Sequence, residues 1–104
     1  MNSSEKPSAL RLPLFRTGQV VGTPGALGLL DQLGVNPMDL LVRHVLGDVG
    51  DLCDEDRDAN RKAIALGGRV FSSYEVGTGL NAAKVWIITE ADRSSTTLLR
   101  PEDY

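Results

Sequence analysis

The sequence predicts an α+β fold, in which two or three short N-terminal helices pack on an antiparallel sheet meander of three strands, or of four if residues 19–22 join it. Apolar residues recur at helical spacing from about position 24 to 66 and alternate with a period of two from about position 70 onward. Glycines and prolines separate these segments. With 104 residues, 41% of them hydrophobic, the chain can build one small core. We therefore expect a flexible arm over residues 1–12 and a single domain over residues 13–104.

Two helix starts follow the short extended stretch 19–22. Thr23 and Asn36 each stand directly before a proline, which combines a capping side chain with a residue that favours the first helical position. Gly34 ends the first predicted helix, and Gly47 follows the second. The apolar stripe of the second helix is expected to consist of Met38, Leu41, Val42 and Val45.

A third helix is expected within an acidic segment, residues 48–58, and the residues that follow it. The segment contains six acidic residues and one base, Arg57. Asp51 or Asp54 can cap the helix, since acids favour a helix N-terminus, and Gly67 ends it. Its thin apolar face comprises Leu52, Ala59, Ala63 and Leu66, which predicts close packing at the edge of the core.

The second half of the chain has the period of β-strands. In residues 69–76 and 84–90 apolar side chains alternate, and a third strand follows at 96–100. The first of these strands places Val70, Ser72, Tyr74 and Val76 on one side. A tight turn at Asp92 joins the last two strands, because an aspartate carboxylate can accept a hydrogen bond from the amide two residues on.

Charge and cysteine content indicate the cellular compartment and the partners that the protein is expected to have. The net charge of −3 gives no overall attraction to nucleic-acid phosphates or to anionic lipids. No stretch reaches the roughly 18 consecutive apolar residues of a membrane span. The single cysteine cannot form an internal disulfide, and the N-terminal stretch does not have the pattern of a signal peptide. We expect a cytoplasmic protein with no membrane partner.

The acidic segment only partly follows a calcium-binding loop. Asp54, Asp56 and Asp58 occupy its first three alternate positions, as calcium requires. Ala59 and Ala65 then replace the glycine of the sharp bend and the bidentate glutamate. The sequence therefore predicts an acidic helix start and no metal.

Catalytic and cofactor motifs are sparse. His44 and Cys53 are the single members of their residue types, too few for a structural zinc site and without an evident third group for a nucleophile pair. Neither phosphate-binding glycine motif occurs. We predict a protein that is not an enzyme and has no cofactor; a small hydrolase or nuclease would depend on His44, Cys53 and the hydroxyls of residues 94–97.

Two surfaces are candidates for binding a partner. An acidic face can dock a basic protein, and Arg93 with its hydroxyl neighbours can hold an anion or a partner, unless the segment is only a tight turn. The candidate residues are Asp48, Asp51, Asp54, Glu55, Asp56, Asp58, Asp92, Arg93, Ser94 and Thr96. The alternative function is a small nucleic-acid-binding regulator that uses a local patch of Arg11, Arg16, Arg93 and Arg100.

Three motifs carry a resemblance to a known family. They are TPGAL at 23–27, HVLGDVGDL at 44–52 and WIITEADRSSTTL at 86–98. Between Leu12 and Tyr104 the chain resembles small bacterial proteins encoded on plasmids, integrative conjugative elements and prophages, often labelled plasmid-related protein. Members of that family carry a tryptophan where this chain has Val49.

The resemblance implies a mobile-element setting and no particular activity. Some members carry the label of a type I restriction modification subunit, but such an enzyme needs an Asn-Pro-Pro-aromatic segment. Here Met38 and Asp39 follow Asn36-Pro37, and the chain has no room for a cofactor-binding sheet domain. We therefore expect an accessory protein that acts by binding another protein, for example to modulate host defence or plasmid maintenance.

Overall fold

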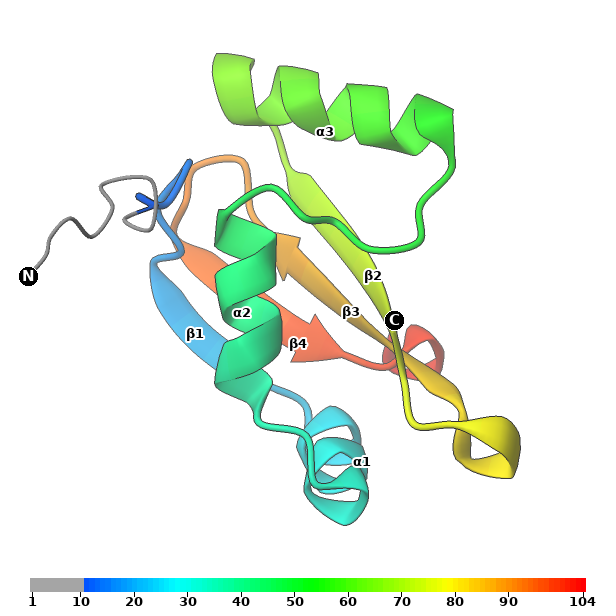
Figure 1. The fold of residues 1–104 in the computed structure, drawn as a ribbon. Coiled ribbons are helices and arrows are strands. Elements are labelled where there is room, and N and C mark those ends of the chain that lie inside the picture. The colour runs from blue at the N-terminus through cyan, green and yellow to red at the C-terminus, as the bar shows by residue number, and fades with distance from the viewer. Residues whose placement is uncertain (1–10) are drawn as a thin grey trace, which may run out of the picture.

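The computed structural model describes residues 11–104, so most of the arm expected over residues 1–12 lies outside the described part. The element order is β1 (Gln19–Gly22), α1 (Pro24–Leu33), α2 (Pro37–Val45), α3 (Asp54–Leu66), β2 (Val70–Val76), β3 (Ala83–Thr89) and β4 (Ser95–Leu99) (Figure 1). Two short 3-10 helices, η2 (Gly79–Asn81) and η3 (Pro101–Asp103), complete the fold. The α+β class predicted from the sequence is confirmed.

The four strands form one mixed sheet in the order β1-β4-β3-β2. β2, β3 and β4 are the predicted antiparallel meander. β1 pairs with β4 in parallel, with Val20 opposite Thr96, so the expectation of a wholly antiparallel sheet is wrong. Backbone bonds from Gln19 N to Ser94 O (3.1 Å) and from Thr23 N to Leu98 O (2.9 Å) hold β1 in this direction. A strand of four residues carries too little alternation to reveal its direction from sequence.

The helices α1 and α2 cover one face of the sheet (Figure 1). Leu30 of α1 and Leu40 and Leu41 of α2 pack there against the sheet. The sheet residues of this core are Tyr74, Val76, Val85, Ile87 and Leu98. This is the side predicted for the alternate residues of β2. On the other face, Phe71 and Tyr104 each contact Trp86 edge to face, with ring centroids 5.1 and 5.8 Å apart.

Both predicted helix caps are present, but α2 buries only part of the predicted stripe, namely Leu41 and, in part, Val45. The side chain of Thr23 accepts a hydrogen bond from the Ala26 amide, and that of Asn36 accepts one from the Met38 amide. The buried residues of α2 are Leu40, Leu41 and His44. Met38 and Val42, expected in the core, are 58% and 48% exposed.

His44 explains this orientation of α2. Its ring is fully buried, with Nδ1 2.6 Å from the Ser72 hydroxyl and Nε2 2.9 Å from the Thr89 hydroxyl. The Thr89 hydroxyl also lies 2.7 Å from that of Thr96, which donates to the carbonyl of Thr17. A buried imidazole needs such partners, because an unpaired polar group costs free energy away from water. The helix therefore turns His44 toward the sheet and leaves part of its apolar stripe outside.

The third helix packs less closely than the sequence predicts. Cys53 is the N-cap residue and makes no side-chain capping bond, so the predicted cap at Asp51 or Asp54 is wrong. The expected apolar face is only partly present: Leu52 and Ala63 are half-buried, but Ala59 is exposed, Leu66 is 83% exposed, and Asn60 is the buried residue of α3. A helix whose first turns are almost entirely charged has few apolar groups to offer a core.

Asn60 nevertheless fixes α3 to the outer edge of β2. Its side-chain amide donates to the carbonyl of Phe71 (2.5 Å) and accepts from the Phe71 amide (2.9 Å), as a neighbouring strand would. The segment before α3 covers Ser73 in the same way, through backbone bonds to Val49 O (3.0 Å) and from Asp51 N (2.9 Å). Gly50 permits this approach, since a Cβ there would lie 1.9 Å from the Ser73 carbonyl oxygen and φ is +80°. The β2 edge is thereby covered at Phe71 and Ser73.

We predict that the protein loses stability between about pH 6.5 and pH 4 because of His44. Burial lowers the pKa of His44 from 6.5 to about 4, so in this interval the unfolded chain takes up a proton that the folded chain does not. The free energy of unfolding should therefore fall by about 3 kcal/mol as pH drops through the interval. Urea denaturation from about pH 7 to about pH 4.5 measures the loss.

The control is His44→Gln, which keeps a donor and an acceptor but does not titrate. Its stability at neutral pH should be lower and its pH dependence in the same interval flatter. Depressed carboxylate pKa values, such as that of Asp48, which the Arg43 guanidinium lowers, act at more acidic pH. An equal slope in the wild type and in the variant would contradict a neutral, buried His44.

We predict that Asn60→Ala destabilises the protein by about 1 to 3 kcal/mol, because it removes two hydrogen bonds to Phe71 and leaves that amide and carbonyl without their partner. Lys62→Ala, on the exposed side of the same helix, should change stability by less than about 0.5 kcal/mol. Chemical denaturation of the three proteins compares them. If both variants lose the same amount, Asn60 does not hold α3 to the sheet.

Candidate protein-interaction site

β1 is the edge strand of the sheet at the opposite end from β2. β4 is the strand neighbour of β1, and alternate residues of a strand direct their backbone groups to opposite sides. Because the amides of Gln19 and Thr23 bond to β4, the amides and carbonyls of Val20 and Gly22 face outward. Within residues 11–104 these outward groups have no strand partner. Such an edge is a template for another strand.

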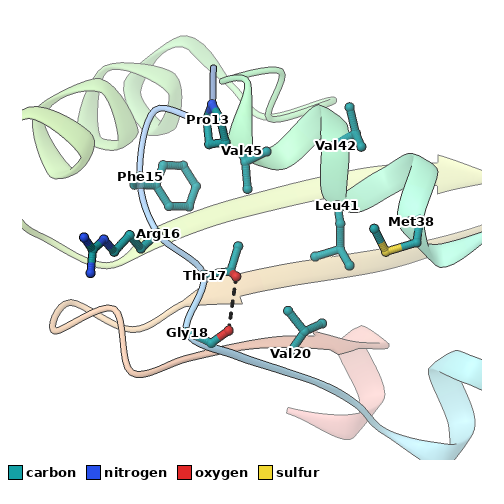
Figure 2. A pocket seen from close by; sticks show the side chains of 10 residues that line it. All are labelled: Pro13, Phe15, Arg16, Thr17, Gly18, Val20, Met38, Leu41, Val42 and Val45. Carbon is teal, nitrogen blue, oxygen red and sulfur yellow. Dashed lines mark hydrogen bonds between the residues drawn. The ribbon is translucent and has the colours of Figure 1, made fainter. Parts of the chain in front are cut away.

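An apolar groove of about 520 Å³ lies beside this edge, between α2 and the segment that leads into β1 (Figure 2). Figure 2 shows the side chains of α2 on one side of it and Val20 of β1 on the other. Its apolar lining consists of Pro13, Phe15, Val20, Met38, Leu41, Val42 and Val45. Val20, Met38 and Val42 are each more than 40% exposed. The groove thus presents apolar surface to water next to unpaired backbone groups.

The N-terminal wall of the groove is fixed to the body by several contacts. The ring of Phe15 meets the buried ring of His44 edge to face, at 5.1 Å between centroids, and the Leu14 amide donates to the carbonyl of Val45 (2.8 Å). Gly18 approaches the β3–β4 turn so closely that a Cβ would lie 2.3 Å from the Ser94 carbonyl oxygen. The groove is therefore a defined feature of the fold and not a gap under a loose segment.

Among residues 11–104, one charged side chain lines the groove, that of Arg16. It is exposed and forms no ion pair with any residue of 11–104. Figure 2 shows it on the N-terminal wall, pointing away from the apolar side chains of α2. The site therefore combines apolar side chains, free backbone groups and one cation at its rim.

The acidic residues of segment 48–58 do not join this site, and several are already paired. Asp48 lies 2.7 Å from Arg43, and Asp51 lies 3.0 Å from Lys84. Hydrogen bonds from these bases hold the pKa of both carboxyls below the ordinary value. Asp58 pairs with Arg61. Within segment 48–58, the exposed acids that form no ion pair with a residue of 11–104 are Asp54, Glu55 and Asp56, in the first turn of α3.

The turn at Asp92 has the predicted geometry. The Asp92 carboxylate accepts a hydrogen bond from the Ser94 amide (2.9 Å), and this contact, together with the Ser94 side chain, lowers the Asp92 pKa. Ser94 is exposed. Thr96 is fully buried in the His44 network and offers no surface to a partner. Of the hydroxyl residues at 94–97, Ser94 therefore lies at the surface and Thr96 in the core.

Arg93 points inward and stabilises the fold. Its guanidinium donates to the backbone carbonyls of Gly68, Glu90, Ala91 and Ala63, the last at 3.1 Å. It also lies 5.4 Å from the centre of the Phe15 ring. Arg93 adopts φ 60°, a left-handed conformation that is costly for a residue with a Cβ. The Arg93 side chain links the β3–β4 turn to the end of α3. The guanidinium donors that were expected to hold an anion therefore already bond to backbone carbonyls.

The four arginines of the alternative function do not present four free guanidinium groups. Arg11 and Arg16 are exposed. Arg93 is bonded to the backbone as described, and Arg100 pairs with Asp103 (2.8 Å) and Glu102 (3.6 Å). Hydrogen bonds from Arg100 and Thr23 hold the pKa of Asp103 far below its usual range.

His44 and Cys53 are not brought together as a catalytic pair. The ring nitrogens of His44 bond to Ser72 and Thr89, and all three residues are fully buried. Cys53 is exposed at the start of α3. In residues 11–104 no group of three or more histidine, cysteine or acidic side chains is placed to hold a metal ion.

None of the helices in residues 11–104 combines the length and the apolar character that crossing a membrane requires.

Comparison of the chain with protein-family models, with curated proteins and with solved structures gives no match. The resemblance to plasmid-related proteins, which is carried by the sequence motifs, stays a prediction.

The sequence does not predict the groove at α2. Met38 and Val42 follow the helical period of a core stripe, so the sequence pattern places them in the core. The signal that could have revealed the site is the single histidine on the same helix, because burial of His44 forces part of the stripe outward.

We predict that Arg93→Ala lowers the free energy of unfolding by about 1.5 to 3 kcal/mol, since it removes charge-assisted hydrogen bonds to Ala63 and Gly68. Arg61→Ala removes an exposed ion pair with Asp58 and should cost less than about 1 kcal/mol. Thermal and chemical denaturation compare the two. An Arg93 variant as stable as the wild type would assign the side chain a role other than tying the turn to α3.

Proposed function

We propose that the protein acts by binding another protein and that the groove with the β1 edge is its binding surface. The observation that carries this proposal is the contrast between the two sheet edges. Asn60 and residues 49–51 cover the edge of β2 at Phe71 and Ser73, whereas no element of residues 11–104 covers the edge of β1, which lies beside an apolar groove. Natural proteins protect exposed sheet edges unless they are used, and contiguous exposed apolar surface marks interaction sites.

The setting that we propose is a mobile genetic element, on which the protein is an accessory factor that modulates host defence or plasmid maintenance. This part rests on the family resemblance of the motifs at 23–27, 44–52 and 86–98. The acidic first turn of α3 is a second candidate surface for a basic partner, because Asp54, Glu55 and Asp56 are exposed there.

The alternative of a nucleic-acid-binding regulator has less support. Binding to a phosphate backbone needs several free cationic groups on one surface. Arg93 is used by backbone carbonyls and Arg100 by two carboxylates. Arg16 and Arg11 are then the remaining arginines of that patch.

We predict that Val42→Glu weakens partner binding by about ten-fold or more, because it places a charge in the apolar groove. Partners are captured from a bacterial host lysate, identified by mass spectrometry, and their affinity for the purified variants is then measured by calorimetry. Val42 is half-exposed on α2, so the substitution should not disturb the fold.

The matched control is Leu80→Glu, which makes the same kind of change at a fully exposed leucine in η2. It should bind like the wild type. A variant with Asp54, Glu55 and Asp56 replaced by alanine tests the acidic surface separately. If Val42→Glu binds the partner as tightly as Leu80→Glu does, the groove is not the binding surface; a loss confined to the triple variant would assign binding to α3.

A further inference from the structure

We propose that the partner binds as a strand: an extended segment pairs with the outer edge of β1 as a fifth strand of the sheet, with apolar side chains at alternate positions toward α2 and an acidic residue beside Arg16. This inference rests on the proposed function and specifies the chemistry of the partner. It is argued from the backbone of β1, from the side chains of the groove and from the charge at its rim.

The backbone of β1 supplies the hydrogen bonds. The amides and carbonyls of Val20 and Gly22 face away from β4, because the ladder to β4 uses the alternate residues Gln19 and Thr23. A strand laid along this edge can therefore form a ladder without displacing a bond of the sheet. Strand addition of this kind obtains affinity from the main chain and specificity from alternate side chains.

The groove supplies the specificity. Val20 lies opposite Thr96 in the register, and Thr96 is buried beneath α2 within the His44 network, so Val20 is on the helix-covered face. Alternate side chains of an added strand point to that same face. There they meet the exposed side chains of Met38 and Val42 and remove them from water. A partner segment with a branched apolar residue at every second position fits this surface.

The charge distinguishes a partner segment from a second copy of this chain. Arg16 is a cation at the rim of the groove with no carboxylate paired to it in residues 11–104. β1 has the sequence QVVG, which contains no acidic residue, so pairing of β1 with its own copy would bring no acid on that strand to Arg16. A segment with an acidic residue at the end that lies beside Arg16 supplies the missing charge.

The test uses a phage-displayed library of random peptides of about ten residues, long enough to span the short edge. Selection on the wild-type protein should enrich sequences with alternating apolar residues and an aspartate or glutamate at one end. The dissociation constant of a synthetic selected peptide is then measured for Val20→Pro and for Val20→Ala. Both variants lose the valine side chain, but only Val20→Pro loses the outward amide.

We expect Val20→Pro to bind the peptide about ten-fold or more weakly than Val20→Ala, because a peptide carbonyl loses its donor at that position. Proline is tolerated on an edge strand when its missing N–H faces outward, so the fold should be retained, and thermal unfolding checks this. Arg16→Glu should in addition reduce binding of the acidic peptide and favour the same peptide with lysine in place of the acid.

Three results would overturn the inference: equal affinities of the two Val20 variants, a library that yields no alternating sequence, or a dimer in sedimentation experiments that Val20→Pro dissociates, which would make a second copy the occupant of the edge. Failure here is distinguishable from failure of the proposed function. If Val42→Glu abolishes binding of a captured partner while Val20→Pro and Val20→Ala bind it equally, the groove binds a protein, but not as an added strand.

Discussion

The fold depends most on the burial of one neutral imidazole. His44 of α2 bonds through its two ring nitrogens to hydroxyls on β2 and β3. The Thr89 hydroxyl also bonds to that of Thr96 on β4, which donates to the carbonyl of Thr17 before β1. A polar ring without access to water must satisfy these bonds, so its position fixes the rotation of α2 on the sheet. Two consequences follow. The segment 13–18 is drawn against the helix through Phe15, and part of the apolar stripe of α2 is left at the surface.

The same arrangement makes the two edges of the sheet unequal. At β2 the side-chain amide of one asparagine bonds to Phe71 as a neighbouring strand would, and a glycine allows the backbone of residues 49–51 to cover Ser73. At β1 no comparable element of residues 11–104 lies outside the strand, and the surface that α2 leaves exposed adjoins it. Unpaired backbone groups and exposed apolar side chains are each a liability for a soluble domain. Their coincidence on one side of the molecule is the physical basis for proposing that a partner covers both.

Local signals predicted much of the fold, whereas contacts between distant residues were not predicted. The caps at Thr23 and Asn36, the turn at Asp92 and the alternation in β2 and β3 each depend on neighbours in the sequence, and the structure confirms them. The parallel direction of β1, the roles of Asn60 and Arg93 and the rotation of α2 depend on partners far along the chain. The spacing of apolar residues along α2 predicts that Met38 and Val42 lie in the core, because this pattern depends only on which residues are apolar. The pattern contains no information that the buried His44 ring must bond to hydroxyls on the sheet. For the same reason the site candidates chosen for their chemistry, Arg93 and Thr96, are structural.

The most direct test of this account is residue-resolved amide hydrogen exchange of the free protein at low concentration. A closed β2 edge and an open β1 edge predict slow exchange of the Phe71 and Ser73 amides, which donate to Asn60 and Val49, and exchange of the Val20 amide at nearly the rate of an unstructured peptide. The Val21 amide, on the β4 side of the same strand, serves as the internal reference and should be protected. Protection of Val20 equal to that of Val21 in the free monomer would show that the β1 edge is already covered and would contradict the proposal that a partner binds there.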